Sequence, residues 1–454
     1  MFLIIDAGTT AVKGVLLSTD GKRTASASAS VSTFMEEGFV EQRPEDWETA
    51  CEAVLAELHQ QKPGHLASIH AVTFTGQMED VIFPAEGRPA VLYSDQRAEN
   101  EAAFLREKVP EIERQAGNPF SPSTPAAKLL WLQLNEPDLS GTVVFSSKDH
   151  LLYRWTGRFV TDTVTAATTG MMNLDKREWT ADVLASIGVS HFHLPELLEP
   201  DERCGYTQQI PWLPDGVPVY CGTGDGGSTA AGAGVVFPGD AYMYIGTTGW
   251  TAAVVDKSGA SQDHFLLPSP LHRGQLLAVV PLFNGGAVFD WLTETFARGE
   301  RDRAEAWLEQ LPAEEDALFH PALFGERYPE PLPRGSGRFH GIGPESTPET
   351  LFRSGVEGLC FSLCTILEEA ALPEGRPLTV IGGAGSSSGW MQFLSTLSRR
   401  ELYIPEDSSF LPALGAAAAS GLIPPQTAGS CTVYTPDHAH LSTRYEGWKR
   451  AFLP

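Results

Sequence analysis

A short pattern of strand, turn and strand occurs once in each half of this 454-residue chain. Residues 2–17 read FLIIDAGTTAVKGVLL, and residues 242–255 read YMYIGTTGWTAAVV. In both, an apolar run ends in a Gly-Thr-Thr turn and a second apolar run follows, which predicts a β-hairpin. The two turns lie 246 − 8 = 238 residues apart, about half the chain. Such a repeat predicts two similar domains that face each other across a cleft.

Both turns have the chemistry of a phosphate-binding loop. Backbone N–H groups and threonine hydroxyls suit phosphate oxygens, and Asp6 could hold a metal ion directly or through water. Lys13, just after the first turn, is a candidate source of positive charge, with a solvent-facing lysine as the alternative. An ordinary Asp-Gly turn would also account for the first pattern. The two turns are therefore candidate sites for a polyphosphate.

A third glycine-rich segment holds a single carboxylate. Residues 221–234, CGTGDGGSTAAGAG, follow the apolar residues 217–220, so we expect Asp225 to be exposed at a strand-to-helix turn. There it would stay ionised beside an anionic ligand and could act as a general base, although a simple helix cap is the alternative. Residues 222–227 also satisfy Gly-x-Gly-x-x-Gly, but no acid ends the next strand, as a dinucleotide site requires. An NAD-dependent oxidoreductase is thus the less favoured alternative.

A fourth segment, Gly382-Gly-Ala-Gly-Ser-Ser-Ser388, follows the apolar residues 378–381 and contains no acid. Without a charge, its glycines could let a flat ring or a ribose lie against the backbone. The alternative is a tight strand-to-helix connection that needs glycine only for its torsion angles. The segment is therefore a candidate nucleoside site.

Length and charge limit the classes of function. The chain is too long for one ordinary core, and we place a domain division near residue 214, in the Pro/Gly-rich stretch 210–218. The formal charge of 32 − 57 = −25 argues against nucleic acid or an anionic membrane as a partner. The start of the chain lacks a basic leader, and no run approaches about 18 apolar residues, so we expect a cytoplasmic protein. The six cysteines form no Cys-x-x-Cys pair and are expected to be reduced structural thiols.

Together these segments resemble the FGGY carbohydrate kinases, members of the actin-like ATPase superfamily, along nearly the whole chain. The further motifs that carry the resemblance are individually weak but occur in the family's order: Thr73-Phe-Thr-Gly-Gln-Met78, Leu92-Tyr-Ser-Asp-Gln-Arg97, Pro125-Ala-Ala-Lys-Leu-Leu-Trp131, Ser147-Lys-Asp-His-Leu151, Gly325-Glu-Arg-Tyr-Pro329 and Trp390-Met-Gln392. The Gly-Gln-Met, Asp-Gln-Arg and Gly-Glu-Arg segments are most similar to those of xylulokinases.

The resemblance implies an α/β fold of two actin-like (ribonuclease H-like) domains, residues 1–214 and 215–454, with a cleft between them. It implies ATP and Mg²⁺ as cofactors, and phosphorylation of a sugar hydroxyl, such as that of the ketopentose D-xylulose. Asp225 falls on the family's catalytic base, and Asp6 with Asp225 on its Mg²⁺ site. The phosphate positions are Gly8, Thr9, Thr10, Lys13, Gly246 and Thr247; the nucleoside positions are Gly383, Ala384 and Ser387; the sugar positions are Gln77, Met78, Glu79, Asp95 and Arg97.

The chain departs from the family in two places. Xylulokinases follow Gly-Gln-Met with His-Gly, whereas this chain has Glu79-Asp80, and a carboxylate would repel an anionic substrate such as gluconate. The family's usual Ala-Asp pair after the last motif reads Ser395-Thr396, which we interpret as a change on a helix surface. The first departure leaves open a kinase for another ketose, a polyol or a sugar acid.

A sensor or switch that binds ATP without phosphorylating a sugar is the alternative from a different class. The Gly-Gln-Met and Gly-Glu-Arg segments, which belong to sugar kinases, argue against it. We expect a small-molecule sugar and ATP as partners, no nucleic acid and no membrane, and a homodimer is one assembly open to the chain.

Overall fold

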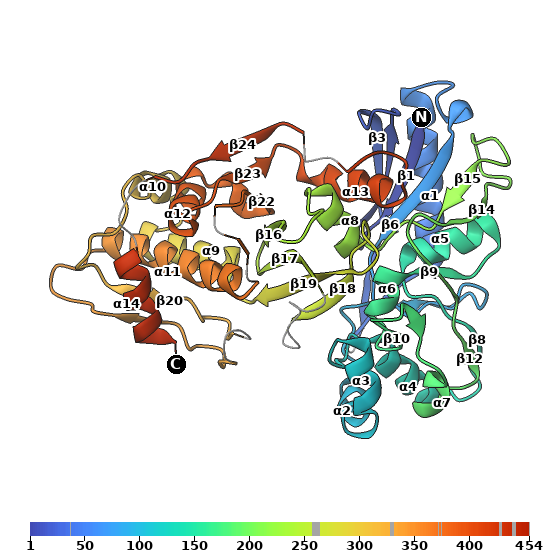
Figure 1. The fold of residues 1–454 in the computed structure, drawn as a ribbon, viewed down its shortest axis with the longest axis horizontal. Coiled ribbons are helices and arrows are strands. Elements are labelled where there is room, and N and C mark those ends of the chain that lie inside the picture. The colour runs from blue at the N-terminus through green and yellow to red at the C-terminus, as the bar shows by residue number, and fades with distance from the viewer. Residues whose placement is uncertain are drawn as a thin grey trace. The chain divides into compact units, whose positions relative to one another are not determined.

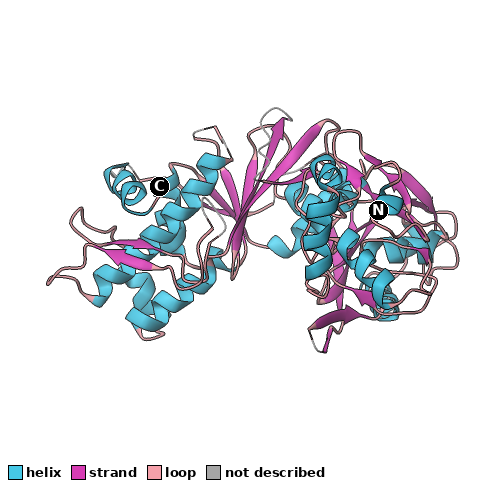
Figure 2. Ribbon diagram, turned by 90° about the horizontal axis from the view of Figure 1, so that it is seen from below, coloured by secondary structure: helices cyan, strands magenta, loops and turns pink. Residues whose placement is uncertain are grey.

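The computed structural model describes residues 1–36, 38–256, 264–326, 331–370, 372–373, 375–425, 429–437 and 442–453. The chain separates into two compact units, which are described one at a time. Unit 1 consists of residues 1–236, 256–277 and 409–427, and unit 2 of residues 237–255, 278–408 and 428–454. Figure 2 shows helices and strands in each unit, as expected for an α/β protein.

Unit 1 is built on a six-stranded sheet with the order β14-β15-β6-β1-β2-β3. The strands are β1 (Phe2–Ala7), β2 (Ala11–Leu17), β3 (Arg23–Ser30), β6 (Ala71–Gly76), β14 (Arg203–Tyr206) and β15 (Pro218–Tyr220). β1 pairs antiparallel with β2 and parallel with β6, which confirms the first predicted hairpin. Leu3 and Ile5 of β1 face one buried cluster and Ile4 faces another, because successive side chains of a strand point to opposite sides. Burial on both faces explains the continuous apolar run.

Helices cover both faces of this sheet. The cluster around Leu3 and Ile5 includes residues of α1 (Pro44–Gln61) and α5 (Ser147–Thr156), and the cluster around Ile4 includes α13 (Leu411–Ala419). α13 packs closely on α8 (Asp225–Gly232), as Figure 1 also shows. Two glycines allow this contact. A Cβ at Gly415 of α13 would lie 1.8 Å from Ser228 O of α8, and a Cβ at Gly232 of α8 would lie 2.0 Å from Leu411 O of α13.

A second core in unit 1 lies among its shorter helices. It contains residues of α2 (Glu99–Lys108), α3 (Pro110–Ala116), α4 (Pro125–Asn135) and α7 (Val183–Ser186). The other elements of unit 1 are β4 (Phe34–Glu36), β5 (Phe39–Gln42), β7 (Ala90–Val91), β8 (Gly141–Thr142), β9 (Val160–Asp162), α6 (Thr163–Ala167), β10 (Met172–Asn173), β11 (Glu178–Trp179), β12 (Phe192–His193), β13 (Glu196–Leu198), β18 (Phe265–Pro268) and the 3₁₀ turn Leu66–Ser68.

The second sheet repeats the first. Its order is β18-β19-β17-β16-β22-β23-β24, and most of it lies in unit 2, with β16 (Ala241–Ile245), β17 (Gly249–Asp256), β19 (Gln275–Leu282), β22 (Leu378–Ile381), β23 (Leu402–Pro405) and β24 (Cys431–Tyr434). β16 pairs antiparallel with β17 and parallel with β22, as β1 does with β2 and β6. β23 is parallel to β22 and antiparallel to β24, as β15 is to β6 and β14. The second hairpin and the predicted repeat are thus confirmed.

Unit 2 is completed by α9 (Gly286–Ala297), α10 (Arg301–Trp307), α11 (Pro348–Glu369), α12 (Ser388–Ser398) and α14 (Ser442–Phe452), with β20 (Leu318–His320) and β21 (Arg338–His340). α11 is long and apolar enough to cross a membrane by length and composition, but most of it is buried inside unit 2, as in the core helix of a globular domain. Its Cys360 and Cys364 are buried and unbridged, in line with the expected structural thiols.

The unit boundary differs from the division expected near residue 214. Residues 215–236 belong to unit 1, because β15 pairs with β6 and α8 packs against α13. Residues 409–427 also return to unit 1. Proline and glycine at 210–218 mark a surface turn that joins β14 to β15, and not a domain linker.

Candidate functional site

The first Gly-Thr-Thr turn is held rigidly at the end of β1. Gly8 N donates to Ala11 O at 3.1 Å, and Thr10 O accepts from Val31 N at 3.0 Å. Asp6 is buried at the end of the strand, and Lys13 Nζ lies 3.6 Å from its Oδ2. Burial raises the pKa of Asp6, and the ammonium of Lys13 opposes this shift. The Lys13 side chain therefore forms an ion pair with Asp6 and does not face solvent alone.

Gln77 connects this turn to the segment that follows β6. Thr9 Oγ1 donates to Gln77 Oε1 at 2.7 Å, while Gln77 Nε2 donates to Gln42 Oε1 at 3.0 Å. Gln42 Nε2 in turn donates to Thr9 O at 2.6 Å. Gln77 is fully buried in this ring of amides. Its side chain therefore fixes the position of Thr9.

Asp225 is the first residue of α8, and the N-cap position belongs to Gly224. A Cβ at Gly224 would lie 2.1 Å from Met78 Sδ, so Met78 packs directly against the start of α8. Asp225 is half-buried, whereas the sequence pattern predicted an exposed side chain. Burial, followed by the carboxylate of Asp6, raises the pKa of Asp225 to about 7. The expectation of a permanently ionised carboxylate is thus corrected: low solvent exposure and a like charge disfavour the anion.

A buried charge network supports the segment that leads to Asp225. Lys148 Nζ lies 2.6 Å from Asp149 Oδ1 and 2.9 Å from Asp162 Oδ2, with all three side chains inaccessible to solvent. Thr223 Oγ1 donates to Asp162 Oδ1 at 3.2 Å. Burial alone would lower the pKa of Lys148, but the two carboxylates hold it above its usual value. Lys148 and Asp149 lie in the family motif Ser147-Lys-Asp-His-Leu151, but nothing in that motif alone predicts their pairing with Asp162.

Glu79 and Asp80 introduce two further carboxylates. Glu79 adopts a left-handed backbone conformation with φ = 63°, which is uncommon for a residue other than glycine. Burial raises the pKa of Glu79 to about 7, against the effect of Lys128. Asp80 is fully buried; its backbone N–H donates to Phe145 O and its Oδ1 accepts from Tyr93 N, both at 3.1 Å. Burial also raises the pKa of Asp80.

Asp95 and Arg97 form a buried pair. Arg97 Nη2 lies 2.8 Å from Asp95 Oδ2 and 2.7 Å from Glu41 Oε1, and its side chain is 3% exposed. The guanidinium also lies 4.1 Å from the ring centroid of Phe39 and 5.0 Å from that of Trp131. Although burial opposes it, Arg97 holds the pKa of Asp95 below its usual value. These contacts hold the 92–97 segment against β5 and α4.

Lys128 on α4 was missed as a site residue. It is fully buried, and its Nζ donates to Glu79 O at 2.9 Å and to Leu92 O at 2.7 Å. Burial lowers the pKa of Lys128 to about 8, against the nearby carboxylates of Glu79 and Asp80. The signal available in the sequence was a lysine inside the apolar helix 125–131.

In unit 2, the second Gly-Thr-Thr turn lies against the start of α9. Gly246 N donates to Thr248 O at 2.9 Å, Gly246 O accepts from Gly286 N at 2.6 Å, and Thr247 O accepts from Ala287 N at 3.1 Å. Thr247 itself is exposed. This turn closes through a shorter hydrogen-bonded loop than the first, in which Gly8 N reaches Ala11 O, and it leaves a threonine side chain at the surface.

The glycine-rich segment 382–388 lies next to this turn. Gly382 has φ = 99°, and a Cβ there would lie 2.4 Å from Ile245 O at the end of β16. Gly383 begins a 3₁₀ turn and is exposed, whereas Ala384 is buried. Ser387 is the N-cap of α12 and accepts from Trp390 N at 3.2 Å. Both candidate nucleotide segments of unit 2 thus occupy the ends of the paired strands β16 and β22.

The structure corrects the helix-surface position that the sequence predicted for Ser395 and Thr396. Ser395 and Thr396 are buried and not on a helix surface: Ser395 Oγ donates to Arg400 O at 2.8 Å and Thr396 Oγ1 accepts from Asp437 N at 3.2 Å. In the Gly-Glu-Arg motif, Glu326 accepts from Asn284 Nδ2 at 2.8 Å. Residues 327–329 of that motif lie outside the described residues.

The residues at the predicted metal position fit Mg²⁺. Within the described residues, no group of three or more His, Cys, Asp and Glu side chains could hold an ion alone. Mg²⁺ prefers oxygen ligands and is usually bound by one or two carboxylates together with phosphate and water. The carboxylate of Asp6 contributes to the raised pKa of Asp225, and the two carboxylates would supply such a pair.

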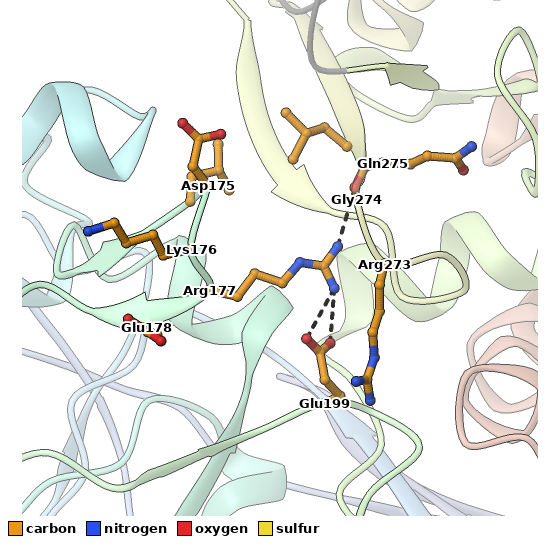
Figure 3. Close-up of a pocket in the computed structure, with 10 residues that line it drawn as sticks. Asp175, Lys176, Arg177, Glu178, Glu199, Arg273, Gly274 and Gln275 are labelled. Atoms are coloured by element: carbon orange, nitrogen blue, oxygen red, sulfur yellow. Dashed lines mark hydrogen bonds and ion pairs between the residues drawn. The ribbon is translucent and has the colours of Figure 1, made fainter.

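A hollow elsewhere in unit 1 is separate from these residues. It has a volume of about 270 Å³ and is lined by the turn between β10 and β11, by Glu199 and by the turn between β18 and β19 (Figure 3). Arg177 Nη1 lies 3.2 and 3.0 Å from the two carboxylate oxygens of Glu199, and its Nη2 lies 3.4 Å from Gln275 O. None of the predicted site residues lines it.

A hairpin turn that occurs twice, on two sheets of the same topology, together with a carboxylate at a helix start, defines an α/β protein of the actin-like kind. The models of the FGGY family of carbohydrate kinases match residues 1–232 with the N-terminal domain and residues 241–422 with the C-terminal domain. The chain therefore belongs to the FGGY family of carbohydrate kinases, which removes the oxidoreductase alternative.

Individual relatives agree with this assignment. The xylulose kinase of Escherichia coli K12 is 30% identical over 435 residues, which cover 92% of this chain and 89% of that protein. The gluconokinase of Bacillus subtilis 168 is 26% identical over 430 residues, covering 88% and 83%. A crystal structure of a xyloylose kinase from Brucella ovis has a TM-score of 0.86 at 27% identity and covers 99% of this chain and 98% of that one.

Proposed function

We propose that this protein is an ATP-dependent sugar kinase that phosphorylates an uncharged ketose, with D-xylulose as the first candidate. The proposal rests on the contact between the 77–80 segment and the start of α8 in unit 1. There Met78 packs against Gly224, the residue before Asp225. The proposed general base and the residues expected to bind the sugar thus belong to one compact unit. Similarity to the xylulose kinase of E. coli supports the substrate.

The proposed chemistry is in-line transfer of the γ-phosphoryl group. Asp225 orients the sugar hydroxyl and accepts its proton as the bond to phosphorus forms, while the bond to ADP breaks. A carboxylate whose pKa is close to neutral serves this task well, because it binds the proton readily at the working pH. The backbone and hydroxyl groups of Gly8–Thr10, with Lys13, contact phosphate oxygens, as do Gly246 and Thr247 in unit 2. Gly383, Ala384 and Ser387 receive the nucleoside.

Mg²⁺, when bound, neutralises phosphate charge. We assign its protein ligands to Asp6 and Asp225, directly or through water. The protein also aligns the sugar with the phosphate groups. Gln77 contributes to this alignment because it accepts the hydrogen bond of 2.7 Å from Thr9 and so holds the first turn in place. We further propose a cytoplasmic location, where ATP and free sugar are both available.

The charge around Asp225 favours an uncharged sugar over gluconate. The carboxylates of Glu79 and Asp6 both disfavour the ionised form of Asp225. The ammonium of Lys128, the cation beside Glu79, is occupied by two backbone carbonyl groups. An incoming sugar carboxylate would therefore meet repulsion.

A coupled assay for ADP formation over ketoses, aldoses, polyols and sugar acids tests the proposal. We expect ADP formation to depend on a ketose and to be strongest with D-xylulose, with gluconate a poor substrate. Strong turnover of gluconate, or of a polyol alone, would replace the proposed substrate. ATP hydrolysis that no sugar stimulates would instead support the sugar sensor.

A further inference from the structure

Lys128 joins the two segments that are expected to bind the sugar. Its Nζ donates to Glu79 O at 2.9 Å in the 77–80 segment and to Leu92 O at 2.7 Å just before Asp95. α4, which carries it, is otherwise apolar on its buried side. A fully buried ammonium is costly unless its protons find acceptors, so these two bonds are a specific arrangement and not general packing.

The bond to Glu79 holds a strained backbone. A left-handed φ of 63° at a non-glycine residue is unfavourable and persists only where the surroundings impose it. The neighbouring residues are also fixed, since Gln77 N donates to Ala7 O and Asp80 N to Phe145 O, both at 3.1 Å. Lys128 supplies the remaining constraint, on the carbonyl group of Glu79 itself.

The bond to Leu92 extends the same constraint to the second segment. Leu92 O also accepts from Asp95 N at 3.1 Å, and Leu92 N donates to Val40 O at 3.0 Å. A second link between the segments runs from Tyr93 N to Asp80 Oδ1 at 3.1 Å. The ammonium thus lies at the junction of the 77–80 and 92–97 segments.

We propose that Lys128 is a positioning residue of the sugar site, which holds Glu79 in its left-handed conformation and ties it to the 92–97 segment. The inference rests on the proposed sugar-kinase function. Lys128 is inaccessible and need not touch the sugar; it acts through Glu79. Its loss should therefore weaken sugar binding and leave ATP binding intact.

A double-mutant cycle with Lys128→Met and Glu79→Gly tests this role. Methionine keeps the length and apolar stem of lysine without its donors, and glycine adopts positive φ at little cost. We expect Lys128→Met to raise the KM for sugar at least about tenfold, with the KM for ATP changed less than about twofold. In the Glu79→Gly background the same substitution should have an effect at least about threefold smaller, because no left-handed side chain remains to be held. The control is Leu132→Met, a conservative change at a buried position of the same helix, which should leave both KM values unchanged.

Hydrogen exchange provides a readout that does not depend on catalysis. In Lys128→Met the amides of Asp80, Tyr93 and Asp95 should exchange faster than in the wild type, while those of the β1–β2 hairpin stay protected. If Lys128→Met does not fold, Lys128→Gln takes its place in the cycle. An unchanged KM for sugar, equal effects in both backgrounds, or unchanged exchange at these amides would overturn the proposal. If no sugar stimulates wild-type turnover, the proposed function fails, and the exchange experiment still decides whether Lys128 holds the two segments.

Discussion

Gly222 lies directly against the backbone of Phe74: a Cβ at position 222 would be 1.9 Å from Phe74 O. Gly222 also has φ = 67°, in the left-handed region. The contact brings the end of β15 onto β6, three residues before Asp225. The position of the candidate base thus depends on a residue without a side chain.

Gly222→Ala should therefore destabilise unit 1 severely. Left-handed strain accounts for about 1 kcal/mol, and the clash with backbone should add on the order of 3 kcal/mol. Gly216→Ala is the matched control, because Gly216 has φ = 83° with open space around it and should lose the strain alone. Urea unfolding of the two variants measures the difference, and equal losses would contradict the close approach.

Asp225→Asn should abolish most turnover and spare nucleotide binding. The amide keeps the shape of the side chain but cannot accept the hydroxyl proton, so kcat should fall about a hundred- to ten-thousand-fold. The KM for ATP should change by less than about twofold. Asp138→Asn, at an exposed position in a loop, is the control for loss of one negative charge. Near-normal kcat in Asp225→Asn would refute the role of general base.

Glu79→Gln should weaken the discrimination against sugar acids. Removal of one charge near Asp225 should raise the ratio of kcat/KM for gluconate to that for D-xylulose about tenfold. The ratio is measured with both substrates in competition assays at one ionic strength. If it stays constant, another residue sets the preference for substrate charge.

The ion pair of Arg444 and Glu357 should be indispensable for unit 2. Arg444 Nη2 lies 2.6 Å from Glu357 Oε2, both side chains are buried, and Arg444 Nη1 donates to Ala313 O at 2.7 Å. Arg444→Met leaves a buried carboxylate unpaired and should cost about 3–5 kcal/mol of unfolding free energy. Arg450→Met, at an exposed position on α14, should stay within about 0.5 kcal/mol of wild type. Partial recovery in the Arg444→Met, Glu357→Leu double variant would confirm that the unpaired charge is responsible.

His320 should make stability fall on the acid side of neutrality. It is buried and its ring stacks on Trp448 with centroids 5.7 Å apart; burial, with Arg338, lowers its pKa to about 4. The unfolded chain binds the proton near pH 6.5, so the stabilisation is complete above that pH and is lost as the pH falls towards 4, by up to about 1.4 kcal/mol per unit. His320→Gln should lose this contribution, so its stability should fall less than that of the wild type between pH 6.5 and 5, whereas His340→Gln, at an exposed position, should follow the wild-type curve. Parallel stability curves for wild type and His320→Gln between pH 6.5 and 5 would argue against it.

The sequence was sufficient for those features that depend on local patterns. The hairpins around Gly8 and Gly246 follow from apolar runs interrupted by turn residues, and their repetition implied the two matching sheets. Asp225 could be placed at a helix start because glycines and small residues surround it.

Features that depend on tertiary contacts could not be obtained in this way. The pKa of Asp225 depends on burial and on Asp6, which is 219 residues away in sequence (225 − 6). Lys128 looks like any helical lysine until Glu79 O and Leu92 O are brought to it by the fold. Ser395 and Thr396 appear polar enough for a surface, yet their hydroxyls satisfy backbone groups of neighbouring loops. Proline and glycine mark a turn equally well inside a domain, and those at 210–218 join β14 to β15 within unit 1.

The packing of α13 on α8 has a consequence for the order in which the protein can be assembled. The helix that packs on α8 lies at residues 411–419, and 411 − 232 = 179 residues separate its start from the end of α8, although both belong to the first unit. A nascent chain that has just emerged as far as residue 236 possesses the strands of the six-stranded sheet and Asp225, but lacks the helix whose Gly415 later contacts Ser228. The ribosome must therefore synthesise the chain through residue 419, including most of unit 2, before unit 1 can complete its own core.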